Sequence, residues 1–391
     1  MAISKICFLM QVPLTKHDYQ KLGIEELIAR GFAVSFLDMT DYYNPEYRSG
    51  FQSSDLANNV EVIRVIKMKE VIAYLKENNK NTFYVVYISS FYERSFFMYR
   101  VMGRYGIKYA VYAMGAMPFN VAYCKANNKP IAIRVKLAQK IHNAAVSSIY
   151  SLPFWLTGIK GPTFELAGGR KIVKRLPPAD KRTKVIFGHL PNYDIYLRKR
   201  EQVESDEQNY FVFLDQYLPF NPDLLIPENR HLRIDADNYY LGLNRFFDYL
   251  EKIFKTTVII AAHPSSQYHL KPDLFGGRQV EKGKTLELIA RSRCALTHCC
   301  TSMDYALLYK KPIMIFTSDE MDLKMGGVIH GVADVLGVSP INMDDEQYLV
   351  MEIPKIDLTA YNAYIADYLK YPGTPDKPYW DIVADNIKML K

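Results

Sequence analysis

The amino-acid sequence predicts an α/β protein made of two doubly wound domains in tandem. Three observations support this fold class. The chain has 391 residues, enough for two domains that each bury a core. Apolar stretches of strand length alternate with amphipathic stretches of helix length in two successive blocks. The strand stretches are apolar throughout, as is typical of parallel strands with helices on both faces.

The first block begins near the N-terminus. Its first helix stretch closes at Gly31, and glycine commonly follows the last turn of a helix. Strand–helix–strand repeats of this length form βαβ units with parallel strands. We expect strands within 5–12, 32–40, 59–67, 82–90 and 107–115, and helices within 18–31, 68–81 and 91–106.

The second block follows a less regular region, 119–184, where one or two basic helices are expected. The charged, Pro-containing stretch 176–184 is typical of a linker, so we place a domain boundary there. We predict domains over 1–180 and 181–355 and a helical tail over 356–391. We expect strands within 184–190, 209–218, 257–264, 293–299 and 312–318, and helices within 239–256, 285–292, 301–311 and 358–371.

Charge is unevenly distributed along the chain. Residues 125–200 hold sixteen Lys/Arg and three Asp/Glu, whereas the whole chain has a net charge of only +7. This basic block indicates either an anionic partner, such as a membrane surface, or a solvated interdomain region. The five cysteines are odd in number and two are adjacent, which argues against a disulfide framework and for a reducing cytoplasm. No apolar run reaches the ~18 residues that a spanning helix needs.

An apolar strand stretch ends abruptly in His263-Pro264, followed by Ser265. Ligand sites in open parallel sheets form at the carboxyl ends of strands. Proline has no N–H and a fixed φ, so it ends the strand and stiffens the loop. A histidine placed there is able to donate to a phosphate. The alternative is a histidine satisfied by local backbone.

A later strand ends in hydroxyl side chains, Thr301 and Ser302, directly before a predicted helix. We expect the hydroxyls to cap free N–H groups, where the helix dipole favours an anion. A plain helix cap is the alternative. This order of motifs, His-Pro, then Ser/Thr, then Lys311-Pro312, resembles the donor-binding domain of GT-B glycosyltransferases. It is most similar to bacterial sialyltransferases and capsule Kdo transferases, and CDP-glycerol polymerases of teichoic acid synthesis share a related layout.

The resemblance implies a GT-B fold, two Rossmann-like domains facing a cleft, with the acceptor bound by domain 1–180 and the nucleotide-sugar by domain 181–355. It places His263, Thr301 and Ser302 together on the donor phosphate, where His263 would act as a catalytic residue that stabilises charge on the leaving group. Cys300 departs from the usual hydroxyl pair, and the position of a ribose-binding glutamate falls near Asp304 or Tyr305. The implied donor-binding residues are His263, Pro264, Ser265, Thr301, Ser302, Cys300, Gln216 and Asp304.

The candidates for the catalytic base are Asp215 and Asp194, which follow strands expected to reach the cleft. A turn or helix cap is the alternative for Asp215. The Gly-containing turn Met114–Pro118 is a weaker candidate for contact with acceptor or donor. We expect no cofactor and no metal, because no nucleotide-binding glycine motif and no zinc spacing is present. Asp235 and Asp237 match the metal motif of GT-A enzymes but sit before a helix, so we interpret them as helix capping.

The resulting hypothesis is a metal-independent glycosyltransferase that extends a bacterial surface glycan such as lipopolysaccharide, O-antigen or capsule. Its partners would be a nucleotide-sugar donor, CMP-linked in the most similar families, and a glycan or lipid-linked glycan acceptor. Residues 125–200 would contact an anionic membrane, and we expect no nucleic-acid partner. The expected location is the cytoplasm, peripheral on the membrane's inner face. The alternatives are a GT-B-like sugar-nucleotide epimerase or hydrolase, and a non-catalytic nucleotide-binding scaffold.

Overall fold

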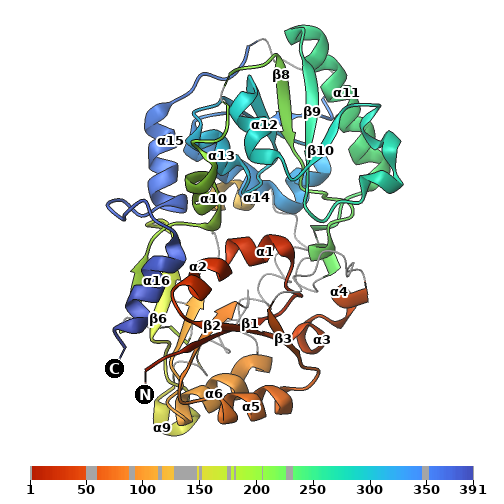
Figure 1. The fold of residues 1–391 in the computed structure, drawn as a ribbon. Coiled ribbons are helices and arrows are strands. Elements are labelled where there is room, and N and C mark those ends of the chain that lie inside the picture. Colours follow the sequence, from red (N-terminus) through yellow and green to blue (C-terminus); the bar gives the residue numbers. More distant parts are fainter. Residues whose placement is uncertain are drawn as a thin grey trace. The chain divides into compact units, whose positions relative to one another are not determined.

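A computed structural model describes residues 2–49, 60–87, 93–112, 117–126, 148, 152–173, 178–179, 182–204, 206–225, 232–345 and 352–390. The chain divides into two compact units. Unit 1 comprises Met1–Ala116, Asn128–Asp194 and Lys370–Lys391, and unit 2 comprises Met117–Asn127 and Ile195–Leu369. Each unit contains one parallel sheet with flanking helices (Figure 1). The predicted α/β class with two doubly wound domains is therefore confirmed.

Unit 1 has a seven-stranded parallel sheet in the order β3-β2-β1-β4-β5-β6-β7. Alternate residues of β1 enter two different cores, with Phe8 on one face and Leu9 on the other, so helices cover both faces. The strands are β1 Lys5–Met10, β2 Ala33–Asp38, β3 Glu61–Arg64, β4 Thr82–Tyr87, β5 Tyr109–Tyr112, β6 Phe164–Ala167 and β7 Lys184–Phe187. The helices are α1 Lys16–Lys21, α2 Ile24–Ala29, α3 Thr40–Tyr43, α4 Pro45–Ser49, α5 Met68–Glu77, η2 Glu93–Ser95, α6 Phe96–Arg104, α9 Phe154–Thr157 and α16 Tyr379–Lys388.

Unit 2 has a six-stranded parallel sheet in the order β10-β9-β8-β11-β12-β13. Helix α10 Pro191–Lys199 starts in unit 1 and ends in unit 2. The strands are β8 Tyr210–Leu214, β9 Thr257–Ala262, β10 Val280–Lys282, β11 Cys294–Thr297, β12 Ile313–Thr317 and β13 Ile341–Asn342. The helices are α7 Val121–Ala126, η3 Pro222–Leu225, α11 Ala236–Phe254, η5 Tyr268–Leu270, η6 Pro272–Phe275, α12 Thr285–Arg291, α13 Met303–Leu308, α14 Asp319–Leu336, α15 Leu358–Tyr364 and the π-helix η7 Ile365–Leu369.

Several elements differ from the sequence-based expectation. The strand at Lys184–Phe187, expected to open the second block, pairs with β6 and completes the first sheet. The end of the chain, expected as part of a separate tail, forms α16, which packs on the first sheet through Trp380. The single helix expected within 18–31 is broken at Gly23, whose φ of +56° is the left-handed region that favours glycine. A Cβ at Gly23 would overlap the Trp380 ring, so this break also makes room for α16.

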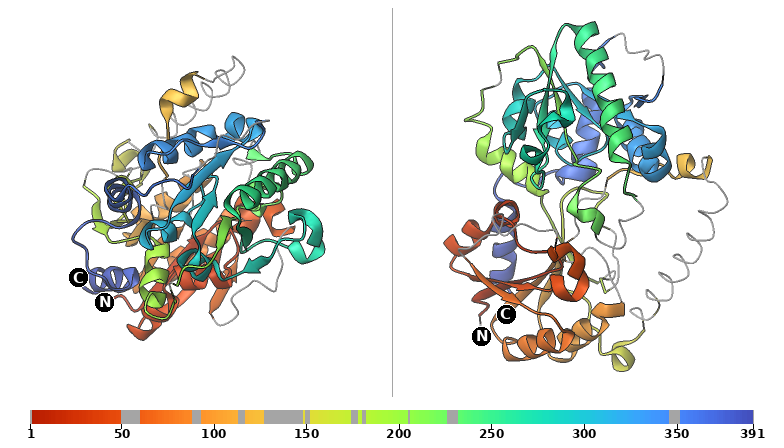
Figure 2. Two further views of the ribbon diagram at one scale, coloured as in Figure 1. Left: turned by 90° about the horizontal axis from the view of Figure 1, so that it is seen from above. Right: turned by 90° about the vertical axis from the view of Figure 1, so that its right-hand side faces the viewer.

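The short first segment of unit 2, Met117–Asn127, packs on the rest of that unit. After β5 the chain reaches Pro118 and Phe119 and forms α7, which lies beside α14 (amber beside blue in Figure 2). Three glycines of α14 allow this approach, because a Cβ at Gly331 would overlap the backbone at Pro118–Phe119. The Tyr123 and His330 rings stack with centroids 3.8 Å apart. The sequence alone gave no sign of this docking.

Candidate functional site

The second sheet has a topological switch between β8 and β11. If the six strands are numbered by their order in the chain, their order across the sheet is 3-2-1-4-5-6. The chain therefore adds strands in one direction from β8 and in the opposite direction from β11. In such sheets a crevice for ligands forms at the carboxyl ends of the two switch strands. Three sequence-predicted motifs lie at that edge: Asp215-Gln216 after β8, His263-Pro264 after β9 and Cys300–Ser302 after β11.

Asp215 joins the turns after β8 and β9. Its Oδ2 accepts hydrogen bonds from the backbone N–H of His263 at 3.1 Å and from the hydroxyl of Tyr268 at 2.8 Å. Its Oδ1 accepts from the backbone N–H of Tyr217 at 2.8 Å. Burial raises the pKa of Asp215, while these hydrogen bonds act in the opposite direction. The carboxylate is thus a buried hub that fixes the backbone at His263.

His263 is half-buried, and Pro264 beside it is exposed. The ring Nδ1 of His263 accepts the backbone N–H of Ser265 at 3.2 Å. In the neutral ring the proton must then be on Nε2, which makes Nε2 a hydrogen-bond donor. The local backbone contact predicted as an alternative is therefore present on one ring nitrogen, and it sets the tautomer that a phosphate oxygen requires.

Two further residues at this edge were missed by sequence reasoning. Tyr268 is buried and makes an edge-on ring contact with Tyr217 at 5.2 Å in addition to its bond to Asp215. Lys282, at the end of β10, donates from Nζ to the carbonyl of Ser266 at 3.0 Å. Tyr268 follows His263 by five residues, but that spacing alone carries no signal. Lys282 adds a cation beside the His-Pro loop.

Tyr217 has a left-handed backbone with φ of +53°, which is uncommon for a residue with a side chain. Its N–H is held by Asp215. Strained backbone of this kind persists where the surroundings fix it, and it is concentrated at functional sites. The neighbouring Gln216 has a buried Oε1 with no hydrogen-bond donor among the described residues. An unpaired buried acceptor at the switch point is suited to a ligand N–H or O–H.

The turn after β11 differs from the expected helix cap. Ser302 has helical φ and ψ of −64° and −17° and makes no side-chain cap hydrogen bond to α13. The N–H groups of Met303, Asp304 and Tyr305 donate instead to carbonyls three residues earlier, at 3.1–3.2 Å. The first turn of α13 is therefore satisfied internally, and the expected free N–H groups are not available there. The exposed Thr301 and half-buried Ser302 bring hydroxyls to this turn.

The His-Pro and Ser/Thr motifs do not lie on adjacent strands. β8 lies between β9 and β11, so the two strand ends are about two strand spacings, ~9.5 Å, apart. Gln216, from β8, bridges toward the β11 turn by donating to the thiol of Cys299. The geometry therefore suits one extended ligand that spans three strand ends, with the β8 turn in the middle.

The cysteines and His298 at this edge belong to the core. Cys300 accepts from the hydroxyl of Thr297 at 3.4 Å, and burial raises its thiol pKa to about 11. His298 is fully buried, and burial lowers its pKa to about 4. His298 Nδ1 donates to the carbonyl of Phe316 at 2.9 Å, and Nε2 then accepts from the Tyr239 hydroxyl at 2.9 Å. Cys299 and Cys300 are therefore buried thiols whose pKa is raised by burial.

Asp194 and Asp304 are both buried. Asp194, in unit 1, accepts from His189 Nε2 at 2.8 Å and from the backbone N–H of Tyr379 at 3.0 Å, so it ties α10 to α16. Its role as catalytic base stays a prediction. Asp304 lies in the first turn of α13 with 4% of its surface exposed, which leaves little of it for a ribose.

The remaining motifs are resolved by local structure. Asp235 is the N-cap of α11 and accepts from the N–H of Asn238 at 2.9 Å, so the helix-capping interpretation is confirmed. Within the described ranges no cluster of three His, Cys, Asp or Glu side chains suits a metal. Met114–Ala116 of the predicted Gly-containing turn lies outside the described residues, as does much of the basic block. No helix in the described part of the chain is both long and apolar enough to cross a bilayer.

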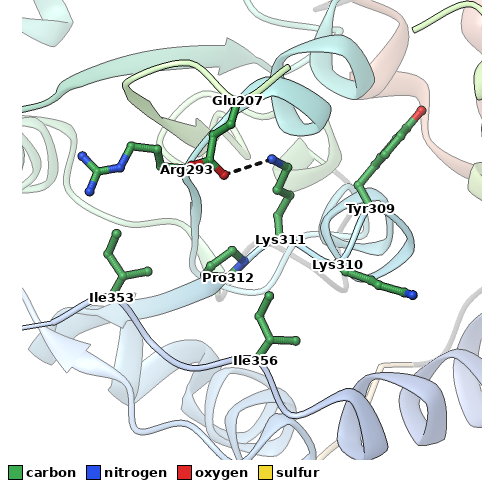
Figure 3. A pocket seen from close by; sticks show the side chains of 8 residues that line it. All are labelled: Glu207, Arg293, Tyr309, Lys310, Lys311, Pro312, Ile353 and Ile356. Carbon is green, nitrogen blue, oxygen red and sulfur yellow. Dashed lines mark hydrogen bonds and ion pairs between the residues drawn. The ribbon is translucent and has the colours of Figure 1, made fainter. Parts of the chain in front are cut away.

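A pocket of about 390 Å³ lies at the opposite, amino edge of the second sheet. It is lined by residues just before β11 and β12, including Arg293, Lys311 and Pro312. Figure 3 shows the ammonium of Lys311 directed at Glu207, 3.4 Å away, while the charged ends of Arg293 and Lys310 point apart. Because its cations do not converge, this pocket is a weaker candidate than the carboxyl edge.

Comparisons with known proteins define the fold. The sequence matches no protein-family model and no curated protein. The solved structure of the wall teichoic acid polymerase TagF aligns at a TM-score of 0.53 and 11% identity, covering 98% of this chain and 88% of that chain. Two histidine variants of that polymerase, one of them soaked with CDPG, align at 0.50 and 11–12% identity with the same coverage. The chain therefore has the GT-B fold.

Proposed function

We propose that the chain is a GT-B glycosyltransferase that moves a sugar from a nucleotide-activated donor to a growing bacterial surface glycan. The observation that carries the proposal is the carboxyl edge of the second sheet. Three adjacent strands are followed there by the histidine with a donating Nε2, by a Gln216 oxygen that has no hydrogen-bond donor within the described ranges, and by the hydroxyls of Thr301 and Ser302. These groups suit the phosphate and the polar edges of a nucleotide.

In this proposal His263 donates to the leaving phosphate as the glycosidic bond breaks. Lys282 contributes positive charge beside the loop, and Thr301 and Ser302 contact another part of the donor. Pre-set donors of this kind neutralise the leaving group, so the reaction requires no metal. We assign Asp215 to positioning, because both of its oxygens already accept hydrogen bonds from the protein.

The donor class is the finer part of the proposal. The sequence resemblance favours a CMP-linked sugar, and one of the matched TagF variants was soaked with CDPG. We further propose that the acceptor is a glycan or lipid-linked glycan, bound by unit 1. The enzyme would then work at the cytoplasmic face of an anionic membrane.

A thermal-shift panel with CMP, UDP, GDP and TDP tests the donor site. We expect one nucleotide to raise Tm, because a ligand at a hundred times its Kd stabilises by about 2.7 kcal/mol. The matching nucleotide-sugar should then release nucleotide faster when a glycan acceptor is added. Acceptor-independent epimerisation would favour the epimerase alternative, and no shift with any nucleotide would favour a non-catalytic scaffold.

A further inference from the structure

We propose that Leu152–Leu156, an exposed apolar turn of unit 1 that includes the start of α9, inserts into the surface of a bilayer containing anionic lipid. The inference deepens the proposed function, since it names the surface that would bring the enzyme to a lipid-linked acceptor. It rests on exposure, on a rigid mounting and on the charge around the turn, all within unit 1.

The apolar turn is unusually exposed. Trp155 has 81% of its surface exposed, more than any other large apolar side chain in the described part of the chain. Its neighbours Leu152, Phe154 and Leu156 are exposed to 43–52%. Scattered apolar residues on a surface need no explanation, but four within five consecutive positions form a patch of the kind that marks an interaction site. Trp and Phe are favoured at the interface between lipid and water.

The backbone of the turn is fixed, so the exposed side chains cannot simply fold inward. The N–H of Gly158 donates to the carbonyl of Phe154 at 2.6 Å, and the Thr157 hydroxyl bonds both Pro153 and Ile159. Gly103 of α6 lies so close to the backbone of Gly158 that any Cβ there would overlap it. The next residue, Ile159, is buried in the unit 1 core.

The surroundings of the turn are cationic. Stretches 96–112 and 152–163 together hold four Lys/Arg and no Asp or Glu. The side chains of Arg100 and Arg104 lie against Gly158, at the end of α9, and Lys160 is exposed two residues further along. An apolar tip with Arg100, Arg104 and Lys160 beside it is complementary to anionic headgroups over acyl chains, whereas a protein partner would need carboxylates placed to match.

Tryptophan fluorescence tests the insertion directly. The chain has two tryptophans, and Trp380 is 1% exposed in the core, so an environment-dependent change reports on Trp155. We expect a blue shift with phosphatidylcholine–phosphatidylglycerol vesicles and little with pure phosphatidylcholine. Raising salt from about 0.1 M to about 1 M shortens the Debye length from about 10 Å to about 3 Å and should weaken binding.

Matched variants locate the effect. The double variant Phe154→Ser/Leu156→Ser keeps Trp155 as the probe, and we expect it to lower vesicle affinity by about tenfold or more. Leu241→Ser, at a 72% exposed leucine of α11 in unit 2, should leave affinity unchanged. Arg104→Glu should weaken binding to anionic vesicles only.

Three outcomes overturn the proposal. They are an absence of any blue shift, an equal shift with both vesicle types, and a concentration-dependent shift without lipid that marks a second copy of the chain as the occupant. The nucleotide-induced rise in Tm, measured on the double variant, separates this proposal from the proposed function. If the double variant loses vesicle binding but its Tm still rises with nucleotide, the bilayer proposal is supported. If the wild type binds vesicles but no nucleotide raises its Tm, the bilayer proposal stands and the proposed transferase function is contradicted.

Discussion

At the scale of single residues, His298 predicts how stability depends on pH. An unfolded histidine takes up a proton near pH 6.5, whereas the buried ring resists protonation until about pH 4. The free energy of unfolding should therefore fall as pH drops through this window, by up to about 3 kcal/mol from this residue. Urea denaturation at pH 7 and pH 5 measures it.

His298→Gln should flatten this pH dependence, because the amide can replace both ring hydrogen bonds without titrating in this range. His269→Gln is the matched control, since His269 is exposed on η5. Equal slopes for the wild type and His298→Gln, with a changed slope for the control, would contradict the assignment of His298 as a neutral core residue.

Asp215 makes a second prediction at this scale. In Asp215→Asn, one side-chain oxygen becomes an NH2 group, which then faces the backbone N–H of either Tyr217 or His263. Because two donors cannot bond to each other, we expect the free energy of unfolding to fall by about 1–3 kcal/mol. Tyr268→Phe removes the hydrogen bond to Asp215 and the weaker 3.3 Å hydrogen bond to the Tyr240 hydroxyl, but it places no N–H against another donor, so it should lose less. If Asp215 positions His263, nucleotide affinity should decline along with stability in both variants. A fall in kcat alone, with stability and affinity unchanged, would instead identify Asp215 as the catalytic base.

At the scale of elements, the packing of α7 on α14 depends on glycines of α14, which have no side chain to separate the two segments. Gly331→Ala would push a methyl group into the backbone at Pro118–Phe119, which cannot yield as a side chain can. We expect it to destabilise by about 1–3 kcal/mol. Gly242→Ala, in the middle of α11, is the matched control.

A Cβ at Gly242 would meet its neighbours at 3.5 Å, an ordinary contact, so alanine there should stabilise by about 0.5–1 kcal/mol. Chemical denaturation of both variants gives the two changes. The docking account is wrong if the two substitutions shift stability in the same direction by similar amounts.

The sequence allowed most strands to be placed, because apolar runs such as Thr257–Ala262 contrast with polar loops. It also placed His263 and Asp215 at strand ends. It did not predict the strand Phe164–Ala167, which is short, or the partners of α7, which are set by contacts distant in sequence. The sequence also did not predict that the N–H groups in the first turn of α13 bond to carbonyls three residues earlier. Thr and Ser are common both as helix N-caps and in tight turns of this kind, so the residue types do not distinguish the two.

At the scale of the whole molecule, the six-stranded sheet repeats the order of the first six strands of the seven-stranded sheet, and the chain passes between the two units four times. Each unit is therefore built from segments that are not contiguous in sequence. The sequence predicts one linker between two domains, whereas the chain changes unit at Asp194/Ile195 and again at Leu369/Lys370. The site residues His263, Gln216 and Ser302 nonetheless lie in one unit, so donor binding is a property of unit 2 in this account.

Calorimetric titration of the nucleotide selected by the thermal-shift panel tests that central claim most directly. The wild type and His269→Ala, which changes an exposed histidine just beyond the same loop, should bind equally. His263→Ala should bind at least about tenfold more weakly, the scale of one lost charge-assisted hydrogen bond. Equal affinity in all three proteins would contradict a phosphate site at the carboxyl edge of the second sheet.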